Sequence, residues 1–441
     1  MNTLTSIPAP QLDRCDRSTL LDYFENSWQL EDTLMRSLVS NDIFYVNPDP
    51  LRNPLVFYLG HSAVFYINKL VNVGLLDQRI NPHYEILFEI GVDPTTPEEL
   101  EEATRHINWP AAEDVWRYRE DVRETIVNVI NAVSLDLPIH PEHPLWALMM
   151  GIEHSRIHFE TSSMLLRQLP VMDLERPDQW RYAPSHGSAP DNPLVEITGG
   201  KASLGKSVDA TTYGWDSDYG HQTDRVAPFA ASQHLVTNGE FLKFVQAGGY
   251  DNREWWDDES WQWKTEHQVC HPKFWTLNGS TYRYRAMFDE LDLPLDWPVE
   301  ANHHEAMAYC RWMGQKTRLM TEAEWAVASG NDTGEVEDNY NLHLKYSSPS
   351  PVGTLDNDQD KGIYDLRGNV WEWLGDNFLG LPGFEPHPLY QDYSEPFFDS
   401  QHKVMRGGSW ASTGAYGAAC CRNWFRPNFY QHAGFRLAQS L

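Results

Sequence analysis

The sequence has 441 residues, of which 41% are hydrophobic and 13% aromatic. This composition supplies enough apolar side chain for large cores and excludes a chain that is disordered throughout. Because 34 Lys and Arg stand against 63 Asp and Glu, the formal net charge is -29. Such a surface repels phosphate backbones and anionic lipid, so we expect neither nucleic acid nor membranes as partners.

Targeting and membrane signals are absent from the sequence. No apolar run approaches the ~20 residues that span a bilayer, and the first residues lack the basic and apolar regions of a signal peptide. The cysteines are few, odd in number and scattered, as is typical of a reducing compartment: Cys15, Cys270, Cys310, Cys420 and Cys421. We therefore expect a cytoplasmic protein, and nothing in the sequence indicates its oligomeric state.

The first ~170 residues carry helical periodicity, on which the fold prediction rests. Apolar residues recur at helical spacing after the possible N-caps Asp16 and Ser18. The next segment is apolar nearly all round, as in a helix buried among several neighbours. The four predicted helices are Leu20–Leu38, Leu55–Val71, Val115–Val133 and Leu145–Leu169. Four long helices predict a bundle, whose core can assemble a metal site from facing side chains.

The second half has a different composition. Residues 172–200 are rich in proline and read as a connection, and the chain beyond them is rich in Gly, Trp, Tyr and Asn. A short strand is predicted over Pro193–Thr198, and the main helices expected are Ala301–Gln315 and Glu322–Ser329. The prediction is a multi-domain protein: an all-α bundle over 1–172, a linker over 173–192 and an α+β domain over 193–441.

Histidines mark a candidate metal site in the helical half. His154 and His158 are four residues apart on one helix, so both imidazoles project from one face, as two ligands of a single ion require. His61 interrupts the apolar second helix, where an ionisable group needs a partner. A hydrogen-bonded core histidine is the alternative for each. Three imidazoles would leave coordination positions open, and they suit Zn, Cu, Fe or Ni alike.

Two glutamates flank the histidine pair. Glu160 is a candidate for orienting a metal-binding histidine through the second nitrogen of its ring. Glu153 could act in the same way, but we interpret it as a solvated charge on the helix surface.

Six phrases in the second half, in this order, resemble the formylglycine-generating-enzyme-like domain, a C-type-lectin-related fold. They are Val236–Phe241, Gly248–Tyr250, Thr321–Trp325, Gly368–Trp373, Arg406–Trp410 and Gly434–Arg436. The first half resembles the DinB-like four-helix bundle, and His61, His154 and His158 fall on its metal positions. This pairing of domains resembles the iron-dependent sulfoxide synthases of ergothioneine and ovothiol biosynthesis.

Further phrases look like the ovothiol branch, the 5-histidylcysteine sulfoxide synthases. They include Phe57–His61, Ile67–Leu70, Arg79–Pro82, Arg156–Ser163 and Gln431–Arg436. The ergothioneine branch typically has an Asp and an Arg that grip a γ-glutamyl group, where this chain has Phe425 and Phe429. A γ-glutamyl carboxylate would be left unpaired there, which is costly, so we expect free cysteine as the sulfur donor.

The resemblance implies an enzyme, an oxidoreductase that uses Fe(II) and O2 to join the sulfur of L-cysteine to the imidazole of L-histidine and to oxidise that sulfur. His61, His154 and His158 would hold the iron. Tyr390 would donate a proton, with Tyr393 as the alternative. The substrate-binding segment would supply four side chains, namely Arg422, Asn423, Trp424 and Arg426.

Three other interpretations stay open. An ergothioneine-type enzyme would take trimethylhistidine (hercynine) with cysteine or a related thiol or selenium donor. A copper-dependent formylglycine oxidase has two cysteines several residues apart, whereas Cys420 and Cys421 are adjacent. A lectin-like binding module on a helical scaffold would have no activity. Many relatives of the ovothiol branch continue into a methyltransferase domain, and we expect this chain to lack one.

Overall fold

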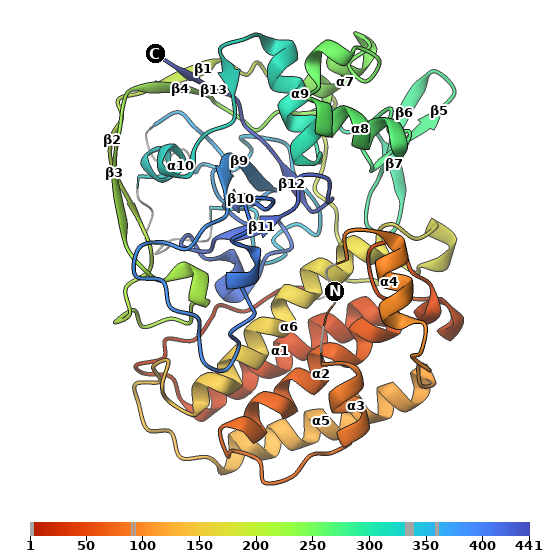
Figure 1. The fold of residues 1–441 in the computed structure, drawn as a ribbon, viewed down its shortest axis with the longest axis vertical. Helices are drawn as coiled ribbons and strands as arrows, with labels where there is room; N and C mark the ends of the chain where they lie inside the picture. The colour runs from red at the N-terminus through yellow and green to blue at the C-terminus, as the bar shows by residue number, and fades with distance from the viewer. Residues whose placement is uncertain (1–3, 90, 92–93, 331–338, 358–360) are drawn as a thin grey trace.

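The computed structural model describes residues 4–89, 91, 94–330, 339–357 and 361–441. A helical half lies below a half built from short strands, loops and further helices (Figure 1). The α-helices of the described residues are α1 Arg17–Met35, α2 Leu55–Asn72, α3 Pro82–Leu87, α4 Pro97–Thr104, α5 Ala112–Ala132, α6 Leu145–Leu166, α7 Asn238–Gln246, α8 Asp258–Glu266, α9 His303–Met313 and α10 Glu322–Ala328.

The strands are short, and most lie in the second half of the chain. They are β1 Leu194–Ile197, β2 Gly200–Leu204, β3 Gln222–Val226, β4 Phe229–Ser232, β5 Trp275–Asn278, β6 Thr281–Arg285, β7 Glu290–Asp292, β8 Thr317–Arg318, β9 Trp371–Asn377, β10 Lys403–Arg406, β11 Asn423–Phe425, β12 Ala433–Gly434 and β13 Ala438–Ser440. The predicted combination of an all-α half and an α+β half is confirmed.

The four predicted long helices are present as α1, α2, α5 and α6, which lie side by side (Figure 1). The Asp16 side chain caps α1 by accepting a hydrogen bond from the backbone N–H of Thr19, 2.8 Å away. Apolar residues surround α2, which is buried along nearly its whole length, as its composition predicted.

The second half contains more helices than predicted, because α7 and α8 are present in addition to α9 and α10. Each of the two missed helices has only nine residues, too few for a clear periodic signal. A local signal did exist for α7, since Thr237 and Glu240 form a capping box at its start. In the helical half, the short α3 and α4 were also missed.

Two four-stranded sheets organise the second half, in the orders β1-β4-β13-β8 and β11-β10-β9-β12. The pairing of β12 with β9 is parallel, and the other pairings within these two sheets are antiparallel. In the second sheet, Val404 of β10 lies opposite Trp424 of β11. The chain between β9 and β10 leaves this sheet and descends to the bundle (Figure 1).

One hydrophobic core runs from the bundle into the second half. Side chains from all four long helices belong to it, and so do Tyr213, Trp215, Phe288 and Trp410. The connecting segment is packed as well, since Trp180 is buried and its indole N–H donates to the Ser347 carbonyl at 2.9 Å. The division of the chain into domains at residues 172 and 193 stays a prediction. None of the described helices is both long and apolar enough to cross a membrane.

A row of buried charged residues on α6 joins the two halves. Glu153, Glu160 and Arg167 are seven residues apart, so they lie on one face of the helix. Both carboxylates accept hydrogen bonds from the second half. Arg167 binds both carboxylate oxygens of Glu300, at 2.6 and 2.7 Å, and its Nε donates to the carbonyl of Arg285. The orientation of α6 is thereby fixed against the second half.

We predict that Arg167→Ala lowers the free energy of unfolding by about 3–5 kcal/mol, because Glu300 would keep a buried charge without its partner. Burial by itself would raise the pKa of Glu300, yet Arg167 and His432 hold it at about 2. Urea denaturation at pH 7 measures the change. Arg105→Ala, at an exposed ion pair with Glu102, is the control and should have little effect. An equally small effect of both variants would contradict the prediction.

Candidate functional site

Three histidines from two helices meet in the bundle. His61 on α2 and His154 and His158 on α6 present ring nitrogens that all lie within 4.8 Å of one another. The Nε2 atoms of His154 and His158 are 3.2 Å apart. Helical spacing sets this pair on one face, and the packing of α2 against α6 brings the third ring to it.

The surroundings of each ring leave a nitrogen available at the centre. The Nδ1 of His61 lies 2.6 Å from the carbonyl oxygen of Phe88, so Nδ1 carries the proton and Nε2 keeps its lone pair. Phe57 stacks on the His61 ring, and Phe65 stacks on the His154 ring at 3.6 Å between centroids. These contacts restrict the rotation of both imidazoles.

The three imidazoles are neutral at pH 7. Burial lowers the pKa of His61 to about 4 and lowers the pKa values of His154 and His158 well below their usual range, with the neighbouring histidines adding to the effect. Neutral imidazole is the form that binds metal ions.

This arrangement fits a divalent metal ion. Two nitrogens bound to one ion at about 2.1 Å and at right angles lie about 3 Å apart, close to the separation of the two Nε2 atoms. The Nδ1 atoms of His154 and His158 are buried and have no hydrogen-bond partner among the described residues. The structure brings the three predicted ligands together, and their role as metal ligands stays a prediction.

Tyr390 reaches this cluster from the loop between β9 and β10. Its ring lies 6.1 Å from the ring of His154 and packs on Phe65. Lys69 of α2 holds the loop, because its Nζ donates to the Leu389 carbonyl at 2.5 Å and lies over the Tyr390 ring. Burial and the nearby Asp392 raise the pKa of Tyr390, so its hydroxyl keeps its proton at neutral pH. This hydroxyl makes no hydrogen bond to the residues that the structure describes.

The ring of the alternative tyrosine, Tyr393, packs on tryptophans. Its ring stacks on Trp215 at 4.3 Å and meets the edge of Trp424. Both tyrosines line a cleft of about 720 Å3 that also contains His61 and His158. The positions favour Tyr390 as the residue beside a bound metal ion.

The four predicted substrate-binding residues do not all reach this cleft. Asn423, Trp424 and Arg426 line it, and Trp424 is stacked on Phe378 at 4.2 Å. Arg422 is not among the residues that line it, and its role in substrate binding stays a prediction. Its guanidinium is buried and binds both carboxylate oxygens of Glu322, at 2.7 and 3.0 Å, so its donors serve the fold.

The structure places the two flanking glutamates differently from the predictions. The oxygens of Glu160 accept hydrogen bonds from Trp371, Ser409 and Ser412 at 2.6–2.8 Å, and no hydrogen bond joins its side chain to a histidine among the described residues. Burial raises its pKa to about 7. Glu153 is fully buried rather than solvated and accepts from Tyr23 and from the backbone of Ala415.

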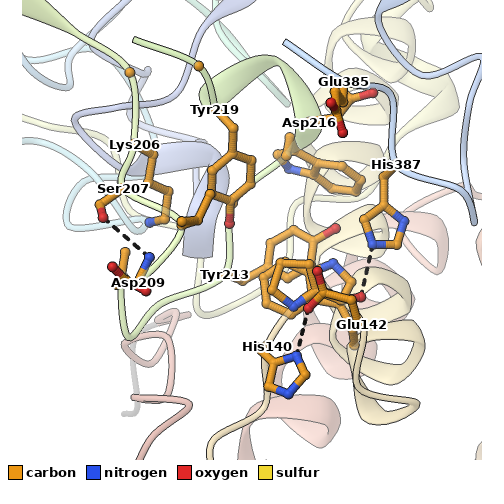
Figure 2. Close-up of a pocket in the computed structure, with 18 of the residues that line it drawn as sticks. His140, Glu142, Lys206, Ser207, Asp209, Tyr213, Asp216, Tyr219, Glu385 and His387 are labelled. Carbon is orange, nitrogen blue, oxygen red and sulfur yellow. Dashed lines mark hydrogen bonds and ion pairs between the residues drawn. The ribbon is translucent and has the colours of Figure 1, made fainter. Parts of the chain in front are cut away.

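A second cleft, of about 1250 Å3, lies on the other side of the two tyrosines, which line it as well. Figure 2 shows its aromatic and acidic walls, with His140 beside Glu142 and His387 bound to the backbone of the bundle. Asp216 in this wall holds the Tyr390 loop, because its carboxylate accepts a hydrogen bond from the Ser394 hydroxyl at 2.7 Å.

Sequence reasoning missed several residues that shape the site. Lys69 and Asp216 position the Tyr390 loop, and Phe65 orients His154. Asp216 and Phe65 carry no local signal, because each acts on a segment that is distant in the chain. Only Lys69 had a hint, as a charged residue in an apolar helix.

The pKa of Asp216 predicts a pH-dependent stability. Burial raises this pKa to about 6 from 3.8. Because the folded state holds the proton more tightly, the contribution to the free energy of unfolding is complete below pH ~4 and is lost as the pH rises to ~6. We predict that Asp216→Asn removes this decrease, measured as the difference from the parent protein in urea denaturation at several pH values. Asp209→Asn, an exposed acid of the same cleft, is the control; parallel curves for Asp216→Asn and the parent would contradict the prediction.

Comparison with known proteins supports the class of the protein. The hercynine oxygenase of Mycobacterium tuberculosis is 36% identical over 233 residues, which cover 49% of this chain and 53% of that protein. The hercynine oxygenase of Mycolicibacterium thermoresistibile is 29% identical, with 88% of each chain covered. Ergothioneine biosynthesis protein 1 of Neurospora crassa is 26% identical over 96% of this chain and 58% of its own length.

The names of these relatives confirm the predicted enzyme class, an oxidoreductase of the oxygenase type. The family model described as the sulfatase-modifying factor enzyme 1-like domain matches residues 183–441, the part of the chain that supplies the Tyr390 loop and one wall of the cleft. The chain therefore belongs to the sulfatase-modifying factor enzyme 1-like family.

Proposed function

We propose that this protein is an Fe(II)- and O2-dependent sulfoxide synthase that joins a thiol sulfur to the imidazole ring of a histidine-type substrate. The observation that carries the proposal is the cluster of three neutral imidazoles beside Tyr390, at the end of a cleft large enough for small molecules. Relatives named hercynine oxygenase, similar over most of the chain, support the same chemistry.

His61, His154 and His158 would hold the iron. The donor set alone also suits zinc or copper, but zinc has no redox chemistry with which to use O2. An iron bound by three neutral ligands would keep its positive charge, and it would supply positions at which a thiol loses its proton and O2 is reduced.

The residues of the chain would then orient the reactants and supply a proton. Tyr390 keeps its proton at neutral pH and has a free hydroxyl beside the histidines, which suits a proton donor. Phe65 and Phe57 fix the imidazole planes. Trp424 and Phe425 line the cleft with aromatic rings.

Hercynine is the first candidate for the imidazole substrate, because two relatives that match 88% of this chain carry its name. Free histidine, which the motifs of the ovothiol branch favour, is the second candidate. Free cysteine is the proposed sulfur donor, since Phe425 and Phe429, which line the cleft, replace the Asp and the Arg that typically grip a γ-glutamyl group in the ergothioneine branch.

The deciding experiment is aerobic incubation of the iron-loaded protein with cysteine and either hercynine or histidine. We predict a product that joins both substrates and carries one sulfoxide oxygen, detected by mass spectrometry. The ratio of the rates with the two imidazoles identifies the substrate. If neither mixture gives a thioether sulfoxide, the proposal is wrong.

The test variant is His154→Ala, and the control is His143→Ala, a half-buried histidine just before α6. Anaerobic titration with Fe(II) should show one bound ion in the parent and in His143→Ala and almost none in His154→Ala. A binding module without a metal centre would take up no ion in any of the three.

Tyr390→Phe tests the proton donor. We predict that the variant still consumes O2 but makes less sulfoxide and more oxidised cysteine that is not joined to the imidazole. The reason is that the hydroxyl that directs the reaction is lost while the ring still packs on Phe65. The product ratio by mass spectrometry is the measurement, and Tyr393→Phe is the control. An unchanged ratio in Tyr390→Phe together with a shifted ratio in Tyr393→Phe would assign the role to Tyr393.

A further inference from the structure

The cleft beside the histidines contains an arginine whose hydrogen-bonding edge is unused. Arg52 lies just before α2 and lines the cleft together with His61 and His158. Its guanidinium makes no hydrogen bond and no ion pair with the residues that the structure describes. Its contacts are with two rings, those of Phe429 and Phe425, whose centroids lie 4.6 and 6.0 Å from the guanidinium carbon.

This state differs from that of the other arginines near the site. Arg167 and Arg422 each bind both oxygens of a buried glutamate. The acid nearest to Arg52 in the chain, Asp49, accepts hydrogen bonds from the Leu51 backbone at 2.9 Å and from Gln168 at 3.5 Å instead. A guanidinium has five N–H donors, and those of Arg52 are bonded to none of the described residues.

The two phenylalanine rings hold the guanidinium without using its donors. A guanidinium that stacks on a ring places its flat face against the π electrons, which leaves the N–H groups at its edge free. The backbone of Arg52 is fixed as well, because its N–H donates to Asp49 and its carbonyl accepts from Asn47 at 2.8 Å. The side chain is therefore positioned in advance for a planar, two-oxygen acceptor such as a carboxylate.

The location matches where an amino-acid substrate would lie. Arg52, His61 and His158 all line this one cleft. A carboxylate bound at Arg52 would leave the rest of a small amino acid within the same cleft as the histidines and Tyr390.

We propose that Arg52 binds the α-carboxylate of an amino-acid substrate. This inference rests on the proposed function for the identity of the substrates, since both the thiol donor and the imidazole substrate carry such a carboxylate. The experiment below distinguishes the carboxylate of the thiol donor from that of the imidazole substrate.

The experiment measures dissociation constants by calorimetry on the Fe(II)-loaded protein without oxygen. Each substrate is paired with its decarboxylated analogue: L-cysteine with cysteamine, and L-histidine with histamine. In Arg52→Gln, we expect a loss of about 10- to 100-fold in affinity for the amino acid whose carboxylate meets Arg52. The affinity for the matching analogue should not change.

Two further variants separate binding from folding. Arg52→Lys keeps the charge but loses the planar pair of donors, so it should recover only part of the affinity. Arg253→Gln removes a distant, exposed guanidinium and should leave all affinities unchanged. If Arg52→Gln weakens cysteine and cysteamine equally, and histidine and histamine equally, or weakens none of them, the proposal is overturned.

Failure of this proposal is distinguishable from failure of the proposed function. A parent protein that binds the amino acids through Arg52 but forms no sulfoxide would keep the assignment of Arg52 and refute the reaction. A protein that forms the sulfoxide while Arg52→Gln keeps the carboxylate preference would refute only the role of Arg52.

Discussion

The attachment of α6 to the second half is the constraint on which the site depends. Glu153, Glu160 and Arg167 form a buried polar row, and each member is satisfied by groups from the other half, apart from one contact of Glu153 with Tyr23. Buried charges of this kind tolerate little displacement, because a lost partner leaves an uncompensated charge in a medium of low polarity. The helix that carries His154 and His158 is thereby held in one position relative to the loop that carries Tyr390.

The motifs of the second half acquire a physical meaning from this attachment. Trp371 and Ser409 belong to two of the phrases that mark the family resemblance, and both donate to Glu160. Glu322 belongs to a third phrase and binds Arg406 and Arg422 together. These residues build the surface against which the bundle lies, and they support the strands that line the cleft.

The polar groups around the cleft fall into two classes with opposite consequences. Those with complete sets of partners, such as Arg422 and Glu160, fix the geometry and have no donor or acceptor left for a substrate. Those with a donor or acceptor that has no partner among the described residues lie at the cleft itself. They are ring nitrogens of the three histidines, the Tyr390 hydroxyl and the guanidinium edge of Arg52. Because an unmet polar group in a half-buried place costs free energy, such groups mark where ligands belong.

The sequence by itself determined the helical half, the helical spacing of His154 and His158, and the family of the second half. These features depend on local periodicity and on motifs that are continuous in the chain, so the residues carry them without tertiary information. The sequence also pointed to Tyr390, through its register after β9, and the tertiary structure brings this residue near His154.

Only the tertiary structure decided which charged residues serve the site and which serve the fold. From the sequence alone, Arg422 and Glu160 look like functional residues. In the structure, Arg422 binds Glu322, 100 residues away in the chain, and Glu160 binds Trp371, more than 200 residues away. Arg52 has no motif, and it becomes a candidate only because Phe425 and Phe429 come to lie beneath it. The reason is physical: the availability of a hydrogen-bonding group depends on what packs against it, and that is settled by contacts between segments far apart in the chain.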